Sequence, residues 1–526
     1  MTAFYGGFLN RYIVFLLLLT AFFSAKDGEV SFKLEAYDNL SREDKVSFIV
    51  PFPEGFLTGT EDVLLVFPEQ KLFPKQKIIS KWKDNSVKLL ELSVKGLEGR
   101  PVLAGKLLLG TFEKERKEAV EKELLENPEL QKNKEAEKLP GWQKEKLKTA
   151  LGKIETFSKP QEYKIKAFAI FEPKWYCETR VWGELLPAAD NFRWRGYEEK
   201  FKSGYILFVL PGKKPEKTEL SYYDTAHALF QMYLRDGNKE YLSAGHKEAK
   251  RYIDEELFRE GPYYGQHRRG KGIPLPPAGL SLLYLQGLAD DYILTGDTAS
   301  LEWAKIMGEQ LLKNIRESDL KLNEFNSGWP TVELLALYNL TGEERYFNKA
   351  KNIIELALGW QDVSGGWKRV YLESEGCTHG HKGGSAFMTA ILCEGLINYH
   401  LLTGDKKTEK ALLKAADWLI KEMYIPNQRA FRYTQCPLST APGIYSLNPL
   451  FLEMLGYATY ISKDEKYRNV ALEVLEDTIK TGNYADSPET FVACYRNSGK
   501  GLYWLYKNYV PVFKKKPVAA PPEGAK

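Results

Sequence analysis

One short segment gathers the side chains that an elimination reaction on an acidic sugar needs. It reads Tyr263-Tyr264-Gly-Gln-His267-Arg268-Arg269. A lyase acting on a uronate glycan requires a group that neutralises the carboxylate, a base for the C5 proton and an acid for the leaving oxygen. We predict His267 or Tyr264 as the base, Arg268 as the neutraliser, and Tyr263 and Arg269 as substrate contacts. The alternative is that the arginines are solvated and that His267 is structural.

A second histidine-bearing segment reads Glu373-Ser-Glu-Gly-Cys-Thr-His379-Gly-His381-Lys382-Gly-Gly384. Its glycines allow the backbone to approach a ligand closely. In an extended segment, His379 and His381 project to the same side. We predict both as further catalytic groups and Lys382 as a substrate contact, with loop packing as the alternative.

Metal binding and a disulfide are two other uses of this segment. Cys377, His379, His381 and the distant Cys436 are of the right types for a tetrahedral zinc site. The Cys-x-His-x-His spacing is not diagnostic, so the sequence predicts no metal and no cofactor, with assistance by calcium left open. Cys377 and Cys436 could instead form a disulfide between neighbouring loops.

Aromatic, arginine and amide side chains in similar places suggest further sugar contacts. Aromatic faces stack on sugar rings, and arginine pairs with carboxylates. Taken singly, each of these residues fits a role in core packing better than a role in sugar binding. Sugar binding is favoured because all of them are expected on the same face of the ring. The predicted substrate contacts are Tyr222, Tyr223, Asp224, Asn326, Trp329, Trp367, Arg432, Tyr433, Tyr495 and Arg496.

The elements that position these residues form a repeat of helical hairpins. Turns such as Leu294-Thr-Gly-Asp297 and Leu402-Thr-Gly-Asp405 recur between helical runs. Glycine caps one helix in the left-handed region, and the acidic residue can cap the next. First helices are expected near Tyr222, Ala278, Trp329, Gly384, Tyr445 and Glu489. We therefore predict an (α/α)6 toroid over residues 219–510.

The repeat has a polarity, because the links between hairpins are much longer than the turns within them. Long ordered loops commonly carry binding and chemistry. In a ring, all of these long links would lie on one face. They are Phe258–Pro277, Arg316–Gly328, Gln361–Gly383, Ile425–Ile444 and Thr481–Pro488.

Other segments surround the helical repeat. Residues 26–111 alternate in polarity and predict the first part of a β-barrel or sandwich, and residues 156–218 predict its second part, with strands at Tyr163–Phe171, Thr179–Gly183 and Tyr205–Val209. Residues 112–155 are rich in Glu and Lys and predict a solvated helical insertion. Residues 511–526 predict a disordered tail. The fold class is therefore multidomain, with β domains before the helical toroid.

The net charge of the chain indicates which partners to expect, and its N-terminal residues indicate its cellular location. The chain has 74 basic and 70 acidic residues and a net charge of +4, without a basic stripe, so a nucleic-acid partner is not expected. Arg11 precedes an apolar run, Tyr12–Phe23, which is short for a membrane span. We predict a cleaved signal over residues 1–25 and a secreted, periplasmic or cell-surface protein. A retained anchor is the alternative, and the only reason to expect a membrane.

Two motifs resemble those of a known family. Pro51-Phe-Pro-Glu-Gly55 and Ser80-Lys-Trp-Lys-Asp-Asn-Ser-Val-Lys88 resemble the N-terminal barrel signature of the exo-rhamnogalacturonan lyase-like family, Pro-Phe-Pro-x-Gly and Trp-Pro-Asp-Gly-Ser-Val. Lys83 and Asn85 depart from it, although Asn tolerates the left-handed turn that Gly would fill. The Leu-Thr-Gly-Asp turns, Tyr223-Asp224 and His267 are also similar. The resemblance implies a RIFT-type β-barrel, a six-hairpin α/α toroid and cleavage of pectic glycans.

Taken together, the sequence predicts a carbohydrate-active protein with a polysaccharide or oligosaccharide substrate. The favoured reaction is β-elimination on a rhamnogalacturonan-like, uronate-containing glycan. One alternative is a glycoside hydrolase on the same toroid, which would need two facing carboxylates. The other is a glycan-binding protein without activity. Carboxylates available for hydrolysis are Asp224, Glu324, Asp362, Glu373, Glu375 and Asp486.

Overall fold

The structure, a computed structural model, describes fourteen stretches of the chain. The expected signal, nearly all of segment 112–155, the tail, Tyr222, Glu375 and Asp486 lie outside them. The described residues are 28–36, 39–41, 44–59, 62–99, 102–110, 112, 167–209, 223–269, 273–274, 283–371, 373, 377–437, 445–481 and 487–508.

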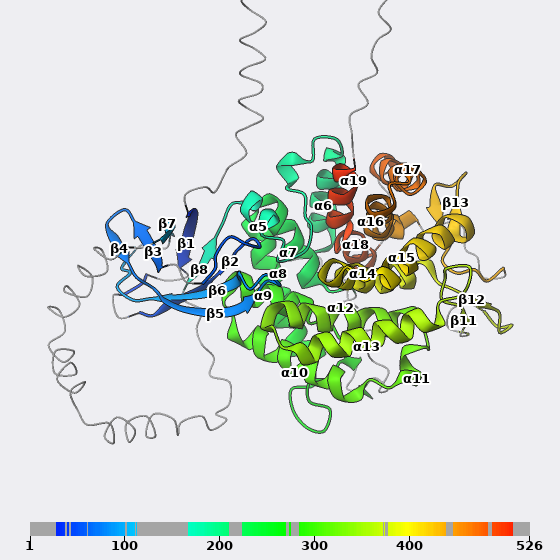
Figure 1. Ribbon diagram of the computed structural model, residues 1–526, viewed down its shortest axis with the longest axis horizontal. Helices are drawn as coiled ribbons and strands as arrows, with labels where there is room; N and C mark the ends of the chain where they lie inside the picture. Colours follow the sequence, from blue (N-terminus) through cyan, green and yellow to red (C-terminus); the bar gives the residue numbers. More distant parts are fainter. Residues whose placement is uncertain are drawn as a thin grey trace, which may run out of the picture.

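Two antiparallel sheets form the first part of the chain and lie on the left in Figure 1. One has the strand order β4-β3-β7-β1-β8 and the other the order β2-β6-β5. Alternate residues of β1, from Val30 to Ala36, are buried, as the period of a strand requires. The prediction of N-terminal β structure is confirmed. The strands are β1 (Glu29–Ala36), β2 (Val46–Pro51), β3 (Asp62–Phe67), β4 (Gln70–Leu72), β5 (Lys75–Lys81), β6 (Val87–Val94), β7 (Val102–Gly110) and β8 (Ala167–Ile170).

The segment after β8 is helical, so the predicted strands at Thr179–Gly183 and Tyr205–Val209 are wrong. The first falls at the end of α5 (Pro173–Thr179) and in the turn that follows, and the second at the end of α6 (Arg195–Phe208). Tyr197, Phe201 and Tyr205 are spaced four apart and are all buried. That helical spacing outweighs the strand preference of aromatic residues. A short 3-10 turn, η1 (Ala188–Asp190), lies between the helices.

The remainder consists of paired helices, as the repeat predicts. Each first helix is mostly buried, which accounts for the apolar composition of α14. The first helices are α7 (Thr225–Asp236), α9 (Gln286–Thr295), α12 (Glu324–Thr341), α14 (Ala386–Thr403) and α16 (Leu452–Ser462), and their partners are α8 (Lys239–Arg251), α10 (Thr298–Asn314), α13 (Glu344–Trp360), α15 (Lys406–Trp418) and α17 (Glu465–Thr481). The last two helices are α18 (Pro488–Tyr495) and α19 (Ser498–Lys507).

The turns inside the hairpins have the predicted chemistry. Gly296 and Gly404 end their helices in the left-handed region, with φ of 79° and 67°. The side chains of Asp297 and Asp405 then accept a backbone N–H from the first turn of the next helix. Each turn therefore caps two helices at once.

The first helices pack against one another in order of sequence. α7 contacts α9, α9 contacts α12, α12 contacts α14, α14 contacts α16, and α16 contacts α19. α18 contacts α7, so the last helices return to the first, and α6 packs beside α17 and α18. The sheets adjoin one end of this arrangement, where α9 contacts β2 and β8 and α12 contacts β5.

The long links carry short structures at the other end. In Figure 1, β11, β12 and β13 lie on the right of the helices, opposite the sheets. The described elements within or beside the long links are η2 (Tyr252–Glu256), β9 (Arg268–Arg269), β10 (Ile273–Pro274), α11 (Glu317–Leu320), β11 (Arg369–Val370), β12 (Lys382–Gly383), η5 (Leu419–Met423), β13 (Tyr424–Ile425), β14 (Ala430–Phe431) and η6 (Tyr445–Phe451).

Candidate functional site

A cavity of about 410 Å³ lies where the sheets meet the helices. Its helical wall comes from α9, α12, α14, α16 and α19, and on α12 and α14 from their C-terminal halves, with residues such as Asn339 and Leu402. The sheet side contributes Glu54, Trp82 and Lys88. The cavity therefore lies at the end of the helices opposite the long links, where the sequence did not place a site.

The two motifs that carry the family resemblance build the sheet wall together. The backbone N–H of Phe52 donates to the carbonyl of Lys88 at 2.9 Å, and the indole N–H of Trp82 donates to the carbonyl of Phe52 at 2.9 Å. Asn85, in the turn between β5 and β6, has φ of 69°. The prediction that Asn85 fills a left-handed position is confirmed.

Lys88 is a buried lysine on this wall. Its ammonium donates to Oδ1 of Asn339 at 2.9 Å and lies 4.4 Å from the centre of the Trp82 ring. Burial lowers the pKa of Lys88 to about 7, and the charge of Glu54 opposes the shift only in part. A large fraction of Lys88 is therefore neutral at neutral pH, as a general base must be.

Asp290 of α9 reaches the cavity from the helical side. Its Oδ2 lies 2.6 Å from Nδ1 of His227, and both side chains are buried. Burial is the main cause that raises the pKa of Asp290 well above its usual range and lowers that of His227 well below its own. Burial therefore favours the uncharged form of each group, and the two side chains share one hydrogen bond.

Basic and aromatic groups complete the lining. Arg180 follows α5 in a left-handed conformation, with φ of 56°, and its Nε lies 3.4 Å from Glu184 Oε1. Lys500 of α19 is buried and also reaches the cavity. The phenol of Tyr503 lies beside Glu184, and burial raises its pKa to about 12, so Tyr503 keeps its proton. Further aromatic lining comes from Trp82, Trp182, Tyr460 and Trp504.

One lining residue, Gln286, connects the cavity to a buried charged group around Arg496. Arg496 donates to Glu394 at 2.7 Å, to Gln286 at 2.9 Å and to the carbonyl of Tyr223 at 3.1 Å. Its guanidinium also lies 4.4 Å from the centre of the Trp329 ring. Three predicted substrate contacts, Tyr223, Trp329 and Arg496, are thus brought together, with each side chain buried.

Asp224 lies next to this group and caps α7. Its carboxylate accepts the backbone N–H groups of His227 and Gly287. Burial raises its pKa, and Arg496 opposes that shift. Tyr223 and Asp224 both have positive φ, 61° and 63°, although neither is glycine. Such strain is held by the surrounding contacts and is concentrated at functional sites.

The first long link has separate surroundings. His267 is buried, with Nε2 3.2 Å from Glu256 Oε2 and its ring against Tyr252. Arg268 donates to the carbonyl of Glu255. Tyr263 and Tyr264 are exposed and pack against Phe258 and Trp303, and the side chain of Arg269 lies outside the described residues. Catalysis by this segment stays a prediction.

The third and fourth long links lie side by side. The hydroxyl of Tyr371 in the third link accepts the backbone N–H of Gln435 in the fourth, and the ring of Tyr433 stacks on Phe387 of α14 at 4.4 Å. His379 is exposed and its ring lies 5.8 Å from that of His381. Lys382 is exposed in β12, and Arg432 is half-buried. Their role in substrate binding also stays a prediction.

Three other predicted contacts hold core positions. The indole of Trp367 is buried and donates to the carbonyl of Ala357. Asn326 donates to the carbonyl of Asp319. The Tyr495 ring is buried against Phe201. All three are accounted for by packing and internal hydrogen bonds.

The sequence nevertheless contained signals for the cavity residues that were missed. Lys88 lies inside a motif that the sequence analysis quoted for its fold. Asp290 is a carboxylate within the apolar face of a core helix, and Lys500 lies between two glycines. A charged residue in such a setting is costly unless it is paired, so each marks a special site.

Comparisons with known proteins do not assign a family. The chain matches no protein-family model and no curated protein. Among solved structures, it is similar to cellobiose 2-epimerase from Bacillus thermoamylovorans, at 14% identity over 60% of this chain and 100% of the other, with a TM-score of 0.45. It is also similar to a polysaccharide lyase, at 15% identity over 59% of this chain and 98% of the other, with a TM-score of 0.43. A D-mannose isomerase matches at 12% identity over 61% of this chain and 98% of the other, with a TM-score of 0.47. At these TM-scores the likenesses assign no activity to this chain.

Proposed function

We propose that this chain is a carbohydrate-active enzyme that cleaves a uronate-containing glycan by β-elimination in the cavity between the sheets and the helices. One observation carries the proposal: a buried lysine with a pKa of about 7, Lys88, lines a cavity that also holds cationic groups and several aromatic rings. Aromatic rings suit sugar faces, and cations suit the uronate carboxylate.

The elimination assigns a role to each kind of group. Arg180 and Lys500 would neutralise the sugar carboxylate, which makes the C5 proton more acidic. The neutral amine of Lys88 takes that proton, the C5–H electrons form the C4–C5 double bond, and the bond from C4 to the leaving oxygen breaks. Tyr503, which keeps its proton, or Asp290, whose raised pKa favours the acid form, would supply the proton to that oxygen.

Hydrolysis is the second candidate, and the carboxyl groups of the cavity favour it. Glu54, Glu184 and Asp290 all reach the lining. An inverting or retaining hydrolase needs a protonated acid and an ionised partner. Asp290 would be the acid, because burial holds its proton. These are not the carboxylates that the sequence analysis named for hydrolysis.

The product distinguishes the two reactions. The full chain is incubated with rhamnogalacturonan, with polygalacturonate and with neutral glycans of matched length. We expect new ultraviolet absorbance from the unsaturated uronate end only with the acidic glycans. Reducing ends without that absorbance would mean hydrolysis. Neither signal, together with retained binding, would mean a binding protein and would overturn the catalytic proposal.

The rate should depend on pH through Lys88. Only its neutral form accepts a proton, and its pKa in the folded protein is about 7. The pH dependence of kcat/KM reports the pKa values of the enzyme before substrate binds. We therefore expect kcat/KM to be low at acid pH and to rise as the pH increases through about 7. A profile that is flat across this range would contradict the role of Lys88 as the base.

Fold closure and export belong to the same proposal. The contact of α18 with α7, and α6 beside α17, support a closed ring in which α6 occupies the sixth outer position. The apolar run Tyr12–Phe23 supports export of the chain to the secreted, periplasmic or surface location where glycan polymers are met.

A further inference from the structure

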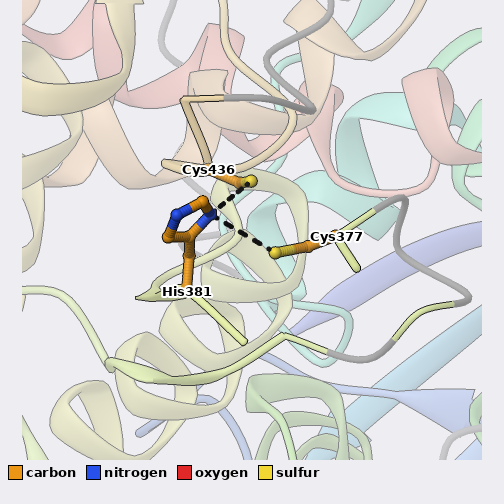
Figure 2. A group of neighbouring side chains, drawn as sticks. All are labelled: Cys377, His381 and Cys436. Atoms are coloured by element: carbon orange, nitrogen blue, oxygen red, sulfur yellow. Dashed lines mark hydrogen bonds between the residues drawn. The ribbon is translucent and has the colours of Figure 1, made fainter. Parts of the chain in front are cut away.

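Cys377, His381 and Cys436 meet in the long links (Figure 2), and His381 directly precedes β12, which lies opposite the sheets in Figure 1. They come from two different long links, and no part of the proposed reaction uses them. Nδ1 of His381 lies 3.5 Å from Sγ of Cys377 and 3.4 Å from Sγ of Cys436. All three ligand atoms lie within 4.8 Å of one another.

These distances fit a tetrahedral metal site. With Zn–S of about 2.3 Å and Zn–N of about 2.0–2.1 Å, a tetrahedral zinc ion separates its sulfur and nitrogen ligands by about 3.6 Å. Figure 2 shows both sulfurs directed at the same ring nitrogen. That nitrogen carries one proton or one lone pair, so a hydrogen bond can be directed fully at only one sulfur. A metal ion satisfies both contacts at once.

The surrounding hydrogen bonds hold the three ligands in place. β11 and β12 pair, with Val370 opposite Lys382, and the N–H of Tyr371 donates to the carbonyl of His381 at 3.0 Å. The hydroxyl of Tyr371 donates to the carbonyl of Gly384 and accepts the N–H of Gln435, next to Cys436. One tyrosine therefore links both ligand-bearing segments, as expected of a positioning group around a metal site.

The donor set selects the metal. Two thiolates and one imidazole favour zinc or a similar soft to borderline ion, whereas calcium and magnesium require oxygen ligands. Both sulfurs are buried, but His381 is only half-buried and faces the exposed ring of His379. That exposed side would leave a fourth position of a bound ion to water or to His379.

We propose that Cys377, His381 and Cys436 bind one zinc ion that fastens the third long link to the fourth. The sequence alone predicts no metal here, because the spacing along the chain is not diagnostic. The structure brings Cys436, which is distant in the sequence, next to Cys377 and His381, and so completes a set of three metal ligands. The ion would tie together the loops at the end of the molecule far from the sheets.

Metal analysis of the full chain tests this proposal. The chain is purified without chelator and its bound metal is measured by inductively coupled plasma mass spectrometry. We expect one zinc per chain in the parent protein, and loss of that zinc in Cys436→Ser and in His381→Asn. Cys177→Ala is the matched control, because this buried thiol lies near Leu234 and not in the cluster. It should keep the metal.

Cobalt substitution and thiol titration provide readouts that do not depend on variant folding. Cobalt bound by the parent chain should show thiolate charge-transfer bands and the visible bands of tetrahedral coordination. Blocking the thiols of the folded parent chain with a mercurial should release zinc to a coloured chelator. A parent chain that takes up neither metal, zinc retained by folded Cys436→Ser, or a Cys377–Cys436 disulfide in unreduced peptides would overturn the proposal.

Discussion

The variant Lys88→Met is expected to lose activity by about 10²–10⁴-fold in kcat, the usual contribution of a general base. Methionine keeps a similar length and apolar stem but cannot accept the C5 proton. Lys88 is one of many lining residues, so the substitution leaves most of the surface that a glycan would contact unchanged. Turnover is measured with the acidic glycan that gives the strongest ultraviolet signal.

Two further variants test whether activity depends on a neutral amine at position 88 or only on a positive charge there, and whether any lysine-to-methionine change in these strands lowers activity. Lys88→Arg keeps a cation that does not deprotonate near neutral pH, so it should lose kcat as severely as methionine does. Lys77→Met is the matched control on the neighbouring strand β5, where the lysine is largely exposed beside Glu91. It should keep full activity. Activity of Lys88→Met within a few-fold of the parent chain would show that Lys88 is not the base.

Stability gives an independent check on the same lysine. The pKa of Lys88 is about 7 when folded and about 10.4 when unfolded. Between about pH 7 and about pH 10.4, Lys88 is protonated in the unfolded chain and mostly neutral in the folded one. The free energy of unfolding therefore rises with pH across this range, and the destabilisation caused by burying Lys88 is greatest below about pH 7. Lys88→Met removes that destabilisation. We expect a melting temperature above that of the parent chain at pH 6, and a difference that shrinks toward pH 10.

Arg496→Met should cause the largest loss of stability, about 3–5 kcal/mol in the free energy of unfolding. Arg496 and Glu394 are both fully buried and form an ion pair at 2.7 Å. The substitution leaves Glu394 without its main charged partner and removes the hydrogen bonds that Arg496 donates to the carbonyl of Tyr223 and to Oε1 of Gln286. Unfolding in urea, followed by circular dichroism, measures the effect.

The double variant Arg496→Met with Glu394→Leu identifies the cause. It removes the unpaired charge as well, so it should recover a large part of the lost stability. Arg345→Met, which breaks only half-exposed ion pairs with Glu309 and Glu343, is the surface control and should cost at most about 1 kcal/mol. A cost for Arg496→Met no greater than that of the control would mean that the buried pair contributes little.

The helical repeat could be predicted because its signals are local. Gly296 and Gly404 take the left-handed conformation, and Asp297 and Asp405 cap the following helices, as their residue types require. The strand expected at Tyr205–Val209 failed because aromatic composition suggested a strand, whereas burial along the face of α6 depends on packing against other helices.

The candidate site could be predicted only in its parts. The motif around Lys88 was recognised, but its contact with Asn339 joins residues that are far apart in the sequence. Nothing in the local pattern states that the sheets cover the C-terminal ends of the helices. The substrate site was predicted in the long links because loops commonly carry function. These links hold a candidate metal site, and the cavity lies elsewhere.

The most direct test of the central claim is a crystal structure of Lys88→Met with an acidic oligosaccharide, a trimer or tetramer of galacturonate or of rhamnogalacturonan. The proposed function predicts sugar density in the cavity, with a uronate carboxylate near Arg180 or Lys500 and C5 facing residue 88. Sugar bound instead at the long links, beside His267 or His379, with the cavity free of sugar, would contradict it.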